Sequence, residues 1–251
     1  MTRARLSVVV VTLNEEDRIR ECLESVAWAD ELIVVDAESR DKTAAIAREL
    51  TDHVFVRPWP GFAAQKNFGL AQAHGDWILS LDADEVVSAA LRAQIEAIVA
   101  GDSDRAGYAV PRRNVFWDRW IRHGGLYPDR QMRLFRRGRG RFVERSVHES
   151  AQVDGLVGQL AGHLEHRSYR DVADFLERAD RYSTLAAAEW LAAGRRSRPI
   201  LDLVGRPVAR FLGMYVARAG FLDGWRGFLL AVLYGYYVFM RSAKVWERAR
   251  Q

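Results

Sequence analysis

Two carboxylates at the end of an apolar segment are the residues of this sequence best suited to chemistry. Residues 77–81 are typical of a buried strand, and Asp82 and Asp84 follow them directly. Residues two apart on an extended chain point to the same side, so these carboxylates would repel each other without a cation. Hard oxygen ligands suit Mg²⁺ or Mn²⁺, which take further ligands from phosphates. The pattern therefore predicts a divalent cation site, with a solvated acidic loop as the alternative.

Alternating strands and helices must position these carboxylates. Continuous apolar segments predict strands at 7–13, 31–36, 54–57 and 77–81. Amphipathic segments between them predict helices at 15–29, 39–50 and 62–73. This order indicates an α/β fold with a Rossmann-like, mostly parallel sheet covered by helices on both faces. Such sheets bind ligands beyond the carboxyl ends of their strands, where this sequence places Thr12, Asn14, Glu15, Asp36, Asp82 and Asp84.

The segment after the second predicted strand carries further polar residues. Asp36 at the strand end can accept hydrogen bonds from a ribose hydroxyl or a base N–H. Ser39 is predicted to cap the next helix and Asp41 falls in its first turn, so capping is favoured over ligand contact for both. Neither a Gly-x-Gly-x-x-Gly motif nor a P-loop is present, which excludes the usual dinucleotide and P-loop folds. A metal on Asp84, together with Lys66, would neutralise a diphosphate instead.

Composition and charge limit the classes of partner. The chain has 251 residues and one cysteine, Cys22, which excludes a disulfide framework or a cysteine zinc cluster and fits a reducing compartment. Its net charge of +4 divides into −9 for residues 1–104 and +13 for residues 105–251. Residues 105–145 contain twelve Arg against three acids. Such a field attracts polyanions, anionic lipid or a phosphorylated acceptor; no nucleic-acid module is recognisable, so no nucleic-acid partner is expected.

The last third of the chain is predicted to be helical. Residues 169–191 have helical spacing of apolar side chains, and residues 227–240 are fourteen residues without a charge. As a helix this uncharged segment is about 21 Å long, short of the ~30 Å of bilayer hydrocarbon, so a conventional transmembrane helix is not predicted. Its Tyr residues and the flanking Trp, Arg and Lys fit an interfacial helix on anionic lipid. A buried helix or an oligomer interface is the alternative.

Four motifs in register resemble those of family 2 glycosyltransferases, which have the GT-A fold. They are Val-Val-Val-Thr-Leu-Asn-Glu-Glu at 9–16, Val-Val-Asp-Ala-Glu-Ser-Arg-Asp-Lys-Thr at 34–43, Gln-Lys-Asn-Phe-Gly at 65–69 and Leu-Asp-Ala-Asp-Glu at 81–85. Segments 122–129, 133–137 and 147–149 further resemble the bacterial lipopolysaccharide-core β-glucosyltransferase-like enzymes. The resemblance covers about residues 6–180 and is more specific for the reaction than for the substrate.

The resemblance implies an inverting transfer from a UDP-sugar to an acceptor hydroxyl. It places Thr12, Asn14, Glu15 and Asp36 around the nucleoside and Lys66 near the nucleotide phosphates. It gives Asp82 a contact with ribose or metal and gives Asp84 the metal, Mg²⁺ or Mn²⁺. A divalent cation bridging the phosphates would stabilise the charge that develops on the leaving diphosphate.

Inversion requires a carboxylate base opposite the leaving group. Glu149 is the first candidate, Asp129 the second and His148 the third. The alternative for Glu149 is a surface acid paired with Arg145. The sequence departs here from the commoner family pattern, because neither a Glu-Asp pair nor a Gln-x-x-Arg-Trp sequence follows.

We therefore expect a GT-A domain over residues 1–167, with a donor half at 1–104 and an acceptor half at 105–167, and a helical region at 168–251 that is interfacial or oligomerising. The expected activity is metal-dependent hexosyl transfer to a lipid-linked or phosphorylated glycan such as the lipopolysaccharide inner core. The enzyme would be cytoplasmic and peripheral to the inner face of the plasma membrane. A nucleotidyltransferase competes but lacks its phosphate loop, and a non-catalytic membrane- or polyanion-binding protein is disfavoured by the intact acidic pair.

Overall fold

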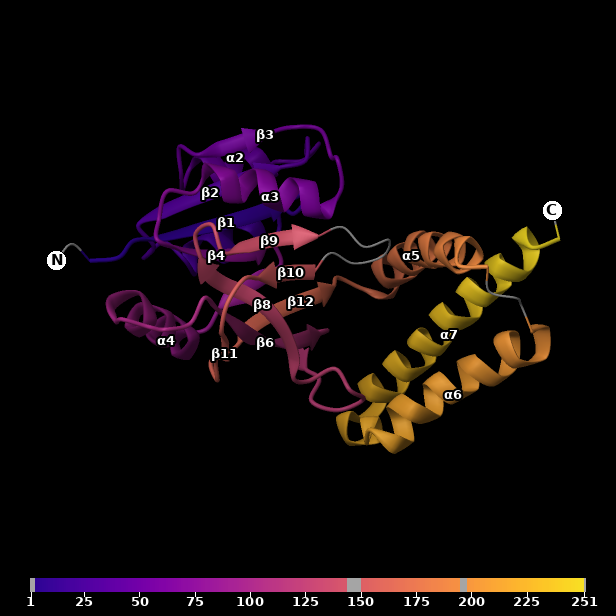
Figure 1. Ribbon diagram of the computed structural model, residues 1–251. Helices are drawn as coiled ribbons and strands as arrows, with labels where there is room; N and C mark the ends of the chain where they lie inside the picture. Colours follow the sequence, from indigo (N-terminus) through magenta and orange to yellow (C-terminus); the bar gives the residue numbers. More distant parts are fainter. Residues whose placement is uncertain (1–2, 144–149, 195–197, 251) are drawn as a thin grey trace. The chain divides into compact units, whose positions relative to one another are not determined.

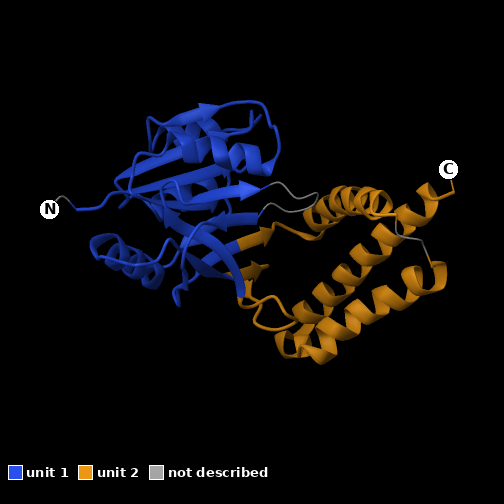
Figure 2. Ribbon diagram, in the orientation of Figure 1, with its two compact units in different colours: residues 1–112, 129–166 blue, residues 113–128, 167–251 orange. Residues whose placement is uncertain are grey.

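The structure is a computed structural model that describes residues 3–143, 150–194 and 198–250. They form two compact units (Figure 2). The sheet unit comprises residues 1–112 and 129–166, and the helical unit comprises residues 113–128 and 167–251.

A mixed sheet organises the sheet unit (Figure 1). Its first four strands are parallel in the order β3-β2-β1-β4, namely β1 (Leu6–Thr12), β2 (Glu31–Asp36), β3 (Val54–Val56) and β4 (Trp77–Asp82). The sheet continues through β8 (Asp129–Arg136), β6 (Gly107–Phe116), β12 (Leu164–Tyr169) and β5 (Glu85–Val87), with β7 (Arg119–Trp120) and β11 (Val157–Gln159) on β6. A separate antiparallel pair consists of β9 (Gly140–Val143) and β10 (Ser150–Val153). Parallel pairing of the first strands brings their carboxyl ends to one edge.

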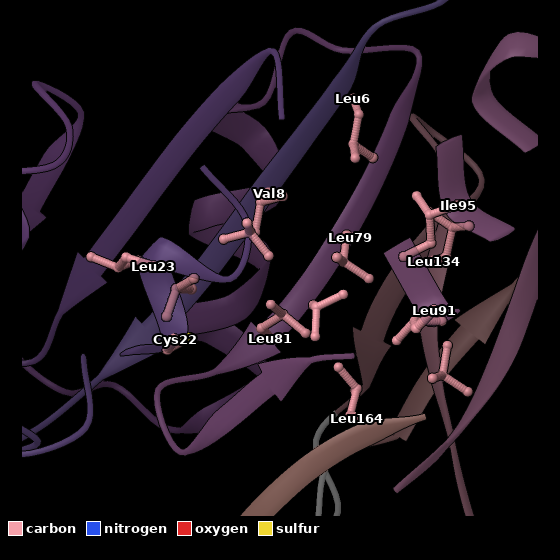
Figure 3. Packing of buried hydrophobic residues seen from close by; sticks show 14 of the residues in the cluster. Leu6, Val8, Cys22, Leu23, Leu79, Leu81, Leu91, Ile95, Leu134 and Leu164 are labelled. Carbon is pink, nitrogen blue, oxygen red and sulfur yellow. The ribbon is translucent and has the colours of Figure 1, made fainter. Parts of the chain in front are cut away.

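Alternating side chains of the central strands are buried on both faces of the sheet. On one face, even-numbered residues of β1 such as Val8 pack against α1 (Ile19–Glu24), α2 (Thr43–Arg48) and α4 (Ala89–Ala100), as Figure 3 shows for α1 and α4. On the other, odd-numbered residues such as Val9 pack with α3 (Phe62–Gln72). Each fully buried Val or Leu contributes about 1.5–3 kcal/mol of transfer free energy. The predicted fold class, a sheet with helices on both faces, is confirmed.

The first two helices are shorter than predicted. The segments 15–18 and 39–42 are turns, because their polar groups bond to each other across the two loops instead of continuing a helix: Glu16 N–H donates to Asp41 Oδ2 (3.2 Å), and Lys42 N–H donates to Glu16 Oε2 (3.0 Å). The prediction that Ser39 caps the second helix is wrong, since α2 starts at Thr43 after Lys42. Asp41 does accept the Thr43 N–H, at 3.0 Å.

The helical unit is built around one long helix, α7 (Gly224–Arg248). It packs against α5 (Val172–Ala192) and against a helix spanning residues 199–217. This helix contains α6 (Arg206–Leu212) between π-helical turns η1 (Leu201–Gly205) and η2 (Gly213–Ala217), and η3 (Gly220–Asp223) joins it to α7. The buried Asp223 carboxylate accepts the backbone N–H of His123 at 2.8 Å, which fastens the 113–128 segment to these helices.

Candidate functional site

Three of the predicted site residues meet where the parallel strands end. Thr12 of β1 pairs in register with Asp36 of β2, and Val11 pairs with Asp82 of β4. The carboxyl ends of parallel strands share one edge of the sheet, so these side chains come together. In the sequence, Thr12 and Asp36 are 24 residues apart, and Asp36 and Asp82 are 46 residues apart. Thr12 and Asp36 are buried.

The loops after β1 and β2 are joined by hydrogen bonds. The Asn14 N–H donates to Ser39 Oγ at 2.8 Å, and the Ser39 hydroxyl and N–H donate to the two Asp36 oxygens at 2.5 and 2.9 Å. The Glu15 N–H donates to Thr43 Oγ1 at 2.8 Å. Asn14 adopts the left-handed backbone, with φ of 53°, which Asn tolerates better than most residues. Asn14, Glu15 and Asp36, three of the four residues predicted to line the nucleoside, are therefore tied together through the loops after β1 and β2.

Asp82 lies between two cations. Lys66 of α3, 1% exposed, places Nζ 2.8 Å from Asp82 Oδ1, and Arg133 of β8 places Nη2 2.6 Å from Asp82 Oδ2. Burial alone would raise the Asp82 pKa, but Arg133 and Lys66 outweigh it and hold that pKa well below its usual range. Burial would lower the Arg133 pKa, but the carboxylates of Asp82 and Glu85 outweigh it and raise that pKa. Asp82 is therefore an anion at every physiological pH.

Glu85 extends this network into the sheet. Its side chain is fully buried, its Oε2 accepts the Asp82 N–H at 3.0 Å, and its Oε1 lies 2.5 Å from Arg133 Nη2 and 3.4 Å from Arg112 Nη1. Arg112 in turn places Nη2 2.5 Å from Asp129 Oδ2. Burial would raise the Asp129 pKa, but Arg112 lowers it below its usual value. An alternating chain of charges thus links the Asp82 loop to β6 and β8.

Asp84 has a different neighbour. Its Oδ2 lies 3.4 Å from Nε2 of His166, a residue of β12 that pairs in register with Glu85. Residues 83–84 form a turn, so Asp82 and Asp84 contact different partners rather than pointing together as on an extended strand. No group of three or more His, Cys, Asp or Glu placed to hold a metal occurs within residues 3–143, 150–194 and 198–250. The Asp84 carboxylate nonetheless fits a hard cation that completes its shell with water and phosphate oxygens, and His166 lies beside it.

The candidate bases differ in their surroundings. Glu149 and His148 lie outside the described residues. Asp129 is engaged on both oxygens, because Arg112 contacts Oδ2 and Gln131 Nε2 donates to Oδ1 at 2.7 Å. A carboxylate held ionised by such contacts is a poorer proton acceptor than a free one.

Several buried polar atoms near the strand ends lack partners among the described residues. Thr12 Oγ1, Ser80 Oγ and both amide atoms of Gln65 belong to this group, and Gln65 is fully buried next to Lys66 on α3. Buried amides are nearly always hydrogen-bonded, so an unpartnered one marks a place that a ligand or water completes. Gln65 opens the Gln-Lys-Asn-Phe-Gly motif of the sequence, which assigned it no role.

Comparison with known proteins gives consistent results. The model of glycosyl transferase family 2 matches residues 7–153. The chain is similar to the lipopolysaccharide core biosynthesis glycosyltransferase LpsC of Rhizobium meliloti, at 32% identity over 97% of this chain and 92% of that protein. It is also similar to an uncharacterized glycosyltransferase of Rickettsia typhi, at 29% identity over 97% and 87%. The structure resembles the Pyrobaculum calidifontis mannosyltransferase PcManGT in complex with GDP-Man and Mn²⁺, with a TM-score of 0.56, 16% identity and coverage of 98% and 88%, which identifies the GT-A fold.

Proposed function

Because this chain belongs to glycosyl transferase family 2, we propose that it transfers a sugar, with inversion, from a UDP-sugar to a hydroxyl of a lipid-linked glycan. The name of the R. meliloti relative supports the lipopolysaccharide core as the acceptor, and we take the inner core as the part that is modified. The observation that carries the proposal is the arrangement of Thr12, Asp36 and Asp82 at neighbouring strand ends, with Asp84 directly beyond them. Open sheets of this kind bind ligands at that edge.

Each side chain of the site has a distinct task. Thr12, Asn14, Glu15 and Asp36 bind the nucleoside, because Asn14 and Asp36 are joined through Ser39 and the buried Thr12 Oγ1 has capacity for a further hydrogen bond. Lys66 supplies a desolvated positive charge beside Asp82 for the diphosphate. A buried cation acts strongly on a nearby anion, since little water screens it.

The divalent cation, Mg²⁺ or Mn²⁺, would be held by Asp84 and His166, with Asp82 behind them. When bound, it supplies positive charge that stabilises the leaving diphosphate. The donor set fits this role, and the Mn²⁺ in PcManGT supports it. His166 belongs to β12, and the pairing of β12 with β5 brings it beside the turn that contains Asp84.

Glu149 is the proposed base that accepts the proton of the acceptor hydroxyl. Asp129 ranks below it, because the ion pair with Arg112 lowers the Asp129 pKa and so weakens it as a base. Replacing Glu149 by Gln should leave donor binding intact and remove transfer. Wild-type turnover in that variant would exclude the assignment.

We also propose the functional division expected from the sequence. Residues 1–167 would form the catalytic domain, with its donor half at 1–104 and acceptor half at 105–167, and residues 168–251 would attach the enzyme to membrane. The protein would then act at the cytoplasmic face of the plasma membrane, where a lipid-linked acceptor is presented. The excess of basic residues after residue 104 favours an anionic surface.

Calorimetric titration of UDP into the purified protein, with and without Mn²⁺, tests the donor site. We expect metal-dependent binding that Asp84→Ala abolishes and that Asp52→Ala, a change at an exposed acid, leaves unchanged. His166→Ala should weaken the metal dependence while leaving metal-free binding as it is. Failure of UDP to bind under any of these conditions would refute the proposed donor.

A further inference from the structure

The helical unit exposes an unusual amount of apolar surface. Thirteen apolar or aromatic side chains between residues 200 and 239 are at least 41% exposed: Ile200, Leu201, Val204, Val208, Leu212, Val216, Phe221, Leu222, Trp225, Phe228, Val232, Tyr236 and Phe239. Together they expose on the order of 1,000 Å², whereas the largest patch on a typical monomer is about 300–600 Å². A patch of this size requires a partner.

These side chains form one stripe on each of two neighbouring helices. Along 200–217 they recur mainly every fourth residue, and along α7 they recur every three or four residues, which keeps each set on one face. The two stripes adjoin, because Phe228 contacts Phe211 and Tyr215, the residues directly before Leu212 and Val216 of the other stripe, with ring centroids 5.8 and 5.6 Å apart. Phe221, in the connection, also contacts Tyr215 at 6.3 Å. The exposed surface is therefore a continuous face of a helical hairpin.

Charge selects the partner of this face. Between residues 198 and 246 the acids are Asp202 and Asp223, and both are buried. The same segment carries seven basic residues: Arg198, Arg206, Arg210, Arg218, Arg226, Arg241 and Lys244. Several of their guanidinium groups stack on aromatic rings, as Arg206 does on Trp190 (4.6 Å) and Arg226 on Trp225 (4.7 Å). An apolar face bordered by cations and aromatic rings matches the interface of an anionic bilayer.

The contacts of α7 indicate whether this helix lies in the bilayer plane or crosses the bilayer. Among the described residues, the segment Gly220–Arg248 is long and apolar enough to span by length and composition, although the sequence pattern did not predict a span. The Lys244 ammonium, however, donates to the Asp180 carboxylate at 2.6 Å and to Ser183 and Thr184 at 2.9 and 2.7 Å, all on α5. α5 also packs along the middle of α7, because Phe175 and Ala179 lie in one apolar cluster with Leu233. A spanning α7 would break these contacts or draw the polar residues of α5 into hydrocarbon.

We propose that the hairpin of residues 198–248 inserts in the plane of an anionic bilayer, with the two exposed stripes in the acyl region and its Arg side chains at the headgroups. This attachment rests on the proposed function only in that a lipid-linked acceptor must be met at a membrane. Both helices lie flat, and neither crosses.

Vesicle flotation of the full-length protein tests the surface. We expect flotation on phosphatidylcholine vesicles that contain phosphatidylglycerol, and about tenfold weaker binding for Val204→Asp or Val232→Asp, because an ionised carboxylate resists entry into the acyl region. Leu156→Asp, at a comparably exposed leucine of the sheet unit, is the matched control and should bind as wild type. Arg198→Gln with Arg218→Gln should weaken binding only to the anionic vesicles.

Nitroxide labels at Trp225→Cys, Val232→Cys and Phe239→Cys test the orientation; the native Cys22 is buried and does not compete. An in-plane helix gives similar depths at all three sites. A deep Val232 between two shallow ends would instead show a span, and concentration-dependent dimerisation without flotation would show a second copy of the chain; either result overturns the proposal. The Val204 and Val232 variants should bind UDP with wild-type affinity. Failure of the membrane site can therefore be distinguished from failure of the donor site.

Discussion

Replacing Arg133 by Met tests whether the buried charges around Asp82 act as one unit. The Arg133 side chain is 5% exposed and contacts both Asp82 and Glu85. Its removal leaves Asp82 paired with Lys66 but leaves the fully buried Glu85 with Arg112 alone, 3.4 Å away. Breaking a buried ion pair from one side costs about 3–5 kcal/mol of unfolding free energy, because a desolvated charge loses its partner. We expect a loss in that range.

The double variant Arg133→Met with Glu85→Gln separates pairing from packing. It removes one charge of each sign, so it should lose about 1–3 kcal/mol less than the sum of the two single variants. Arg130→Met on the same strand is the control, since Arg130 is exposed and donates a hydrogen bond to the Leu160 carbonyl at 3.3 Å. This change should cost less than about 1 kcal/mol.

Urea unfolding followed by circular dichroism measures these values, with the sheet-unit transition fitted separately where two transitions are resolved. The Asp82 pKa lies well below its usual value, so its ionised form stabilises the fold above about pH 4 and loses this effect as pH falls through the folded-state pKa. The difference between wild type and Arg133→Met should therefore shrink in acid. Strict additivity of the double variant, or a loss below about 1 kcal/mol for Arg133→Met, would refute the reasoning.

Three further changes test other parts of the sheet unit. Hydrogen bonds from His74 and Ser7 overcome burial and lower the Glu31 pKa to about 2. Glu31→Gln should therefore lower the free energy of unfolding by about 1–3 kcal/mol near pH 7, and this difference from wild type should vanish as pH falls from about 4.5 to 2. Urea unfolding across pH measures the difference, and a constant value would contradict the prediction. Ser39→Ala removes the hydroxyl hydrogen bonds to Asp36 and Asn14. It should lower the free energy of unfolding by about 1–3 kcal/mol and weaken UDP binding in calorimetry. Unaltered UDP binding would show that this loop is not part of the nucleoside site. Gly69→Ala would put a Cβ 2.4 Å from a Val9 methyl and should lower stability by about 1–3 kcal/mol in thermal unfolding; an unchanged melting temperature would show that α3 shifts freely.

Short-range patterns predicted the first half of the sheet unit well. Continuous apolar strands and the polar residues after them depend on local sequence, and β1, β2, β3 and β4 end within one residue of the predicted positions. Helix lengths were less predictable, because Glu15 and Glu16 donate backbone hydrogen bonds to side chains of a loop 25–28 residues away. Such bonds compete with helix formation and are invisible to periodicity.

Long-range pairing explains what the sequence did not disclose at the site. His166 reaches Asp84 only because β12 pairs antiparallel with β5, and no local pattern around His166 indicates that register. Gln65 belongs to a recognised motif, but no role was predicted for it, because its burial depends on α3 packing against β1 and β2. Residues beside a recognised motif can be predicted from it, whereas residues supplied by a distant strand require the fold.

The arginine-rich segment 105–145 shows why a count of charges does not define a surface. Arg112 and Arg133 are used within the buried network of Glu85. Arg136 donates to the Ser103 carbonyl at 2.6 Å, and Arg137 donates to the Gly75 carbonyl at 3.0 Å. Guanidinium groups bound to protein acceptors contribute less attraction for a polyanion than the sequence total implies. This weakens the polyanion-binding alternative and makes the exposed apolar face of the helical hairpin, rather than the arginine-rich segment, the better candidate for the contact with lipid.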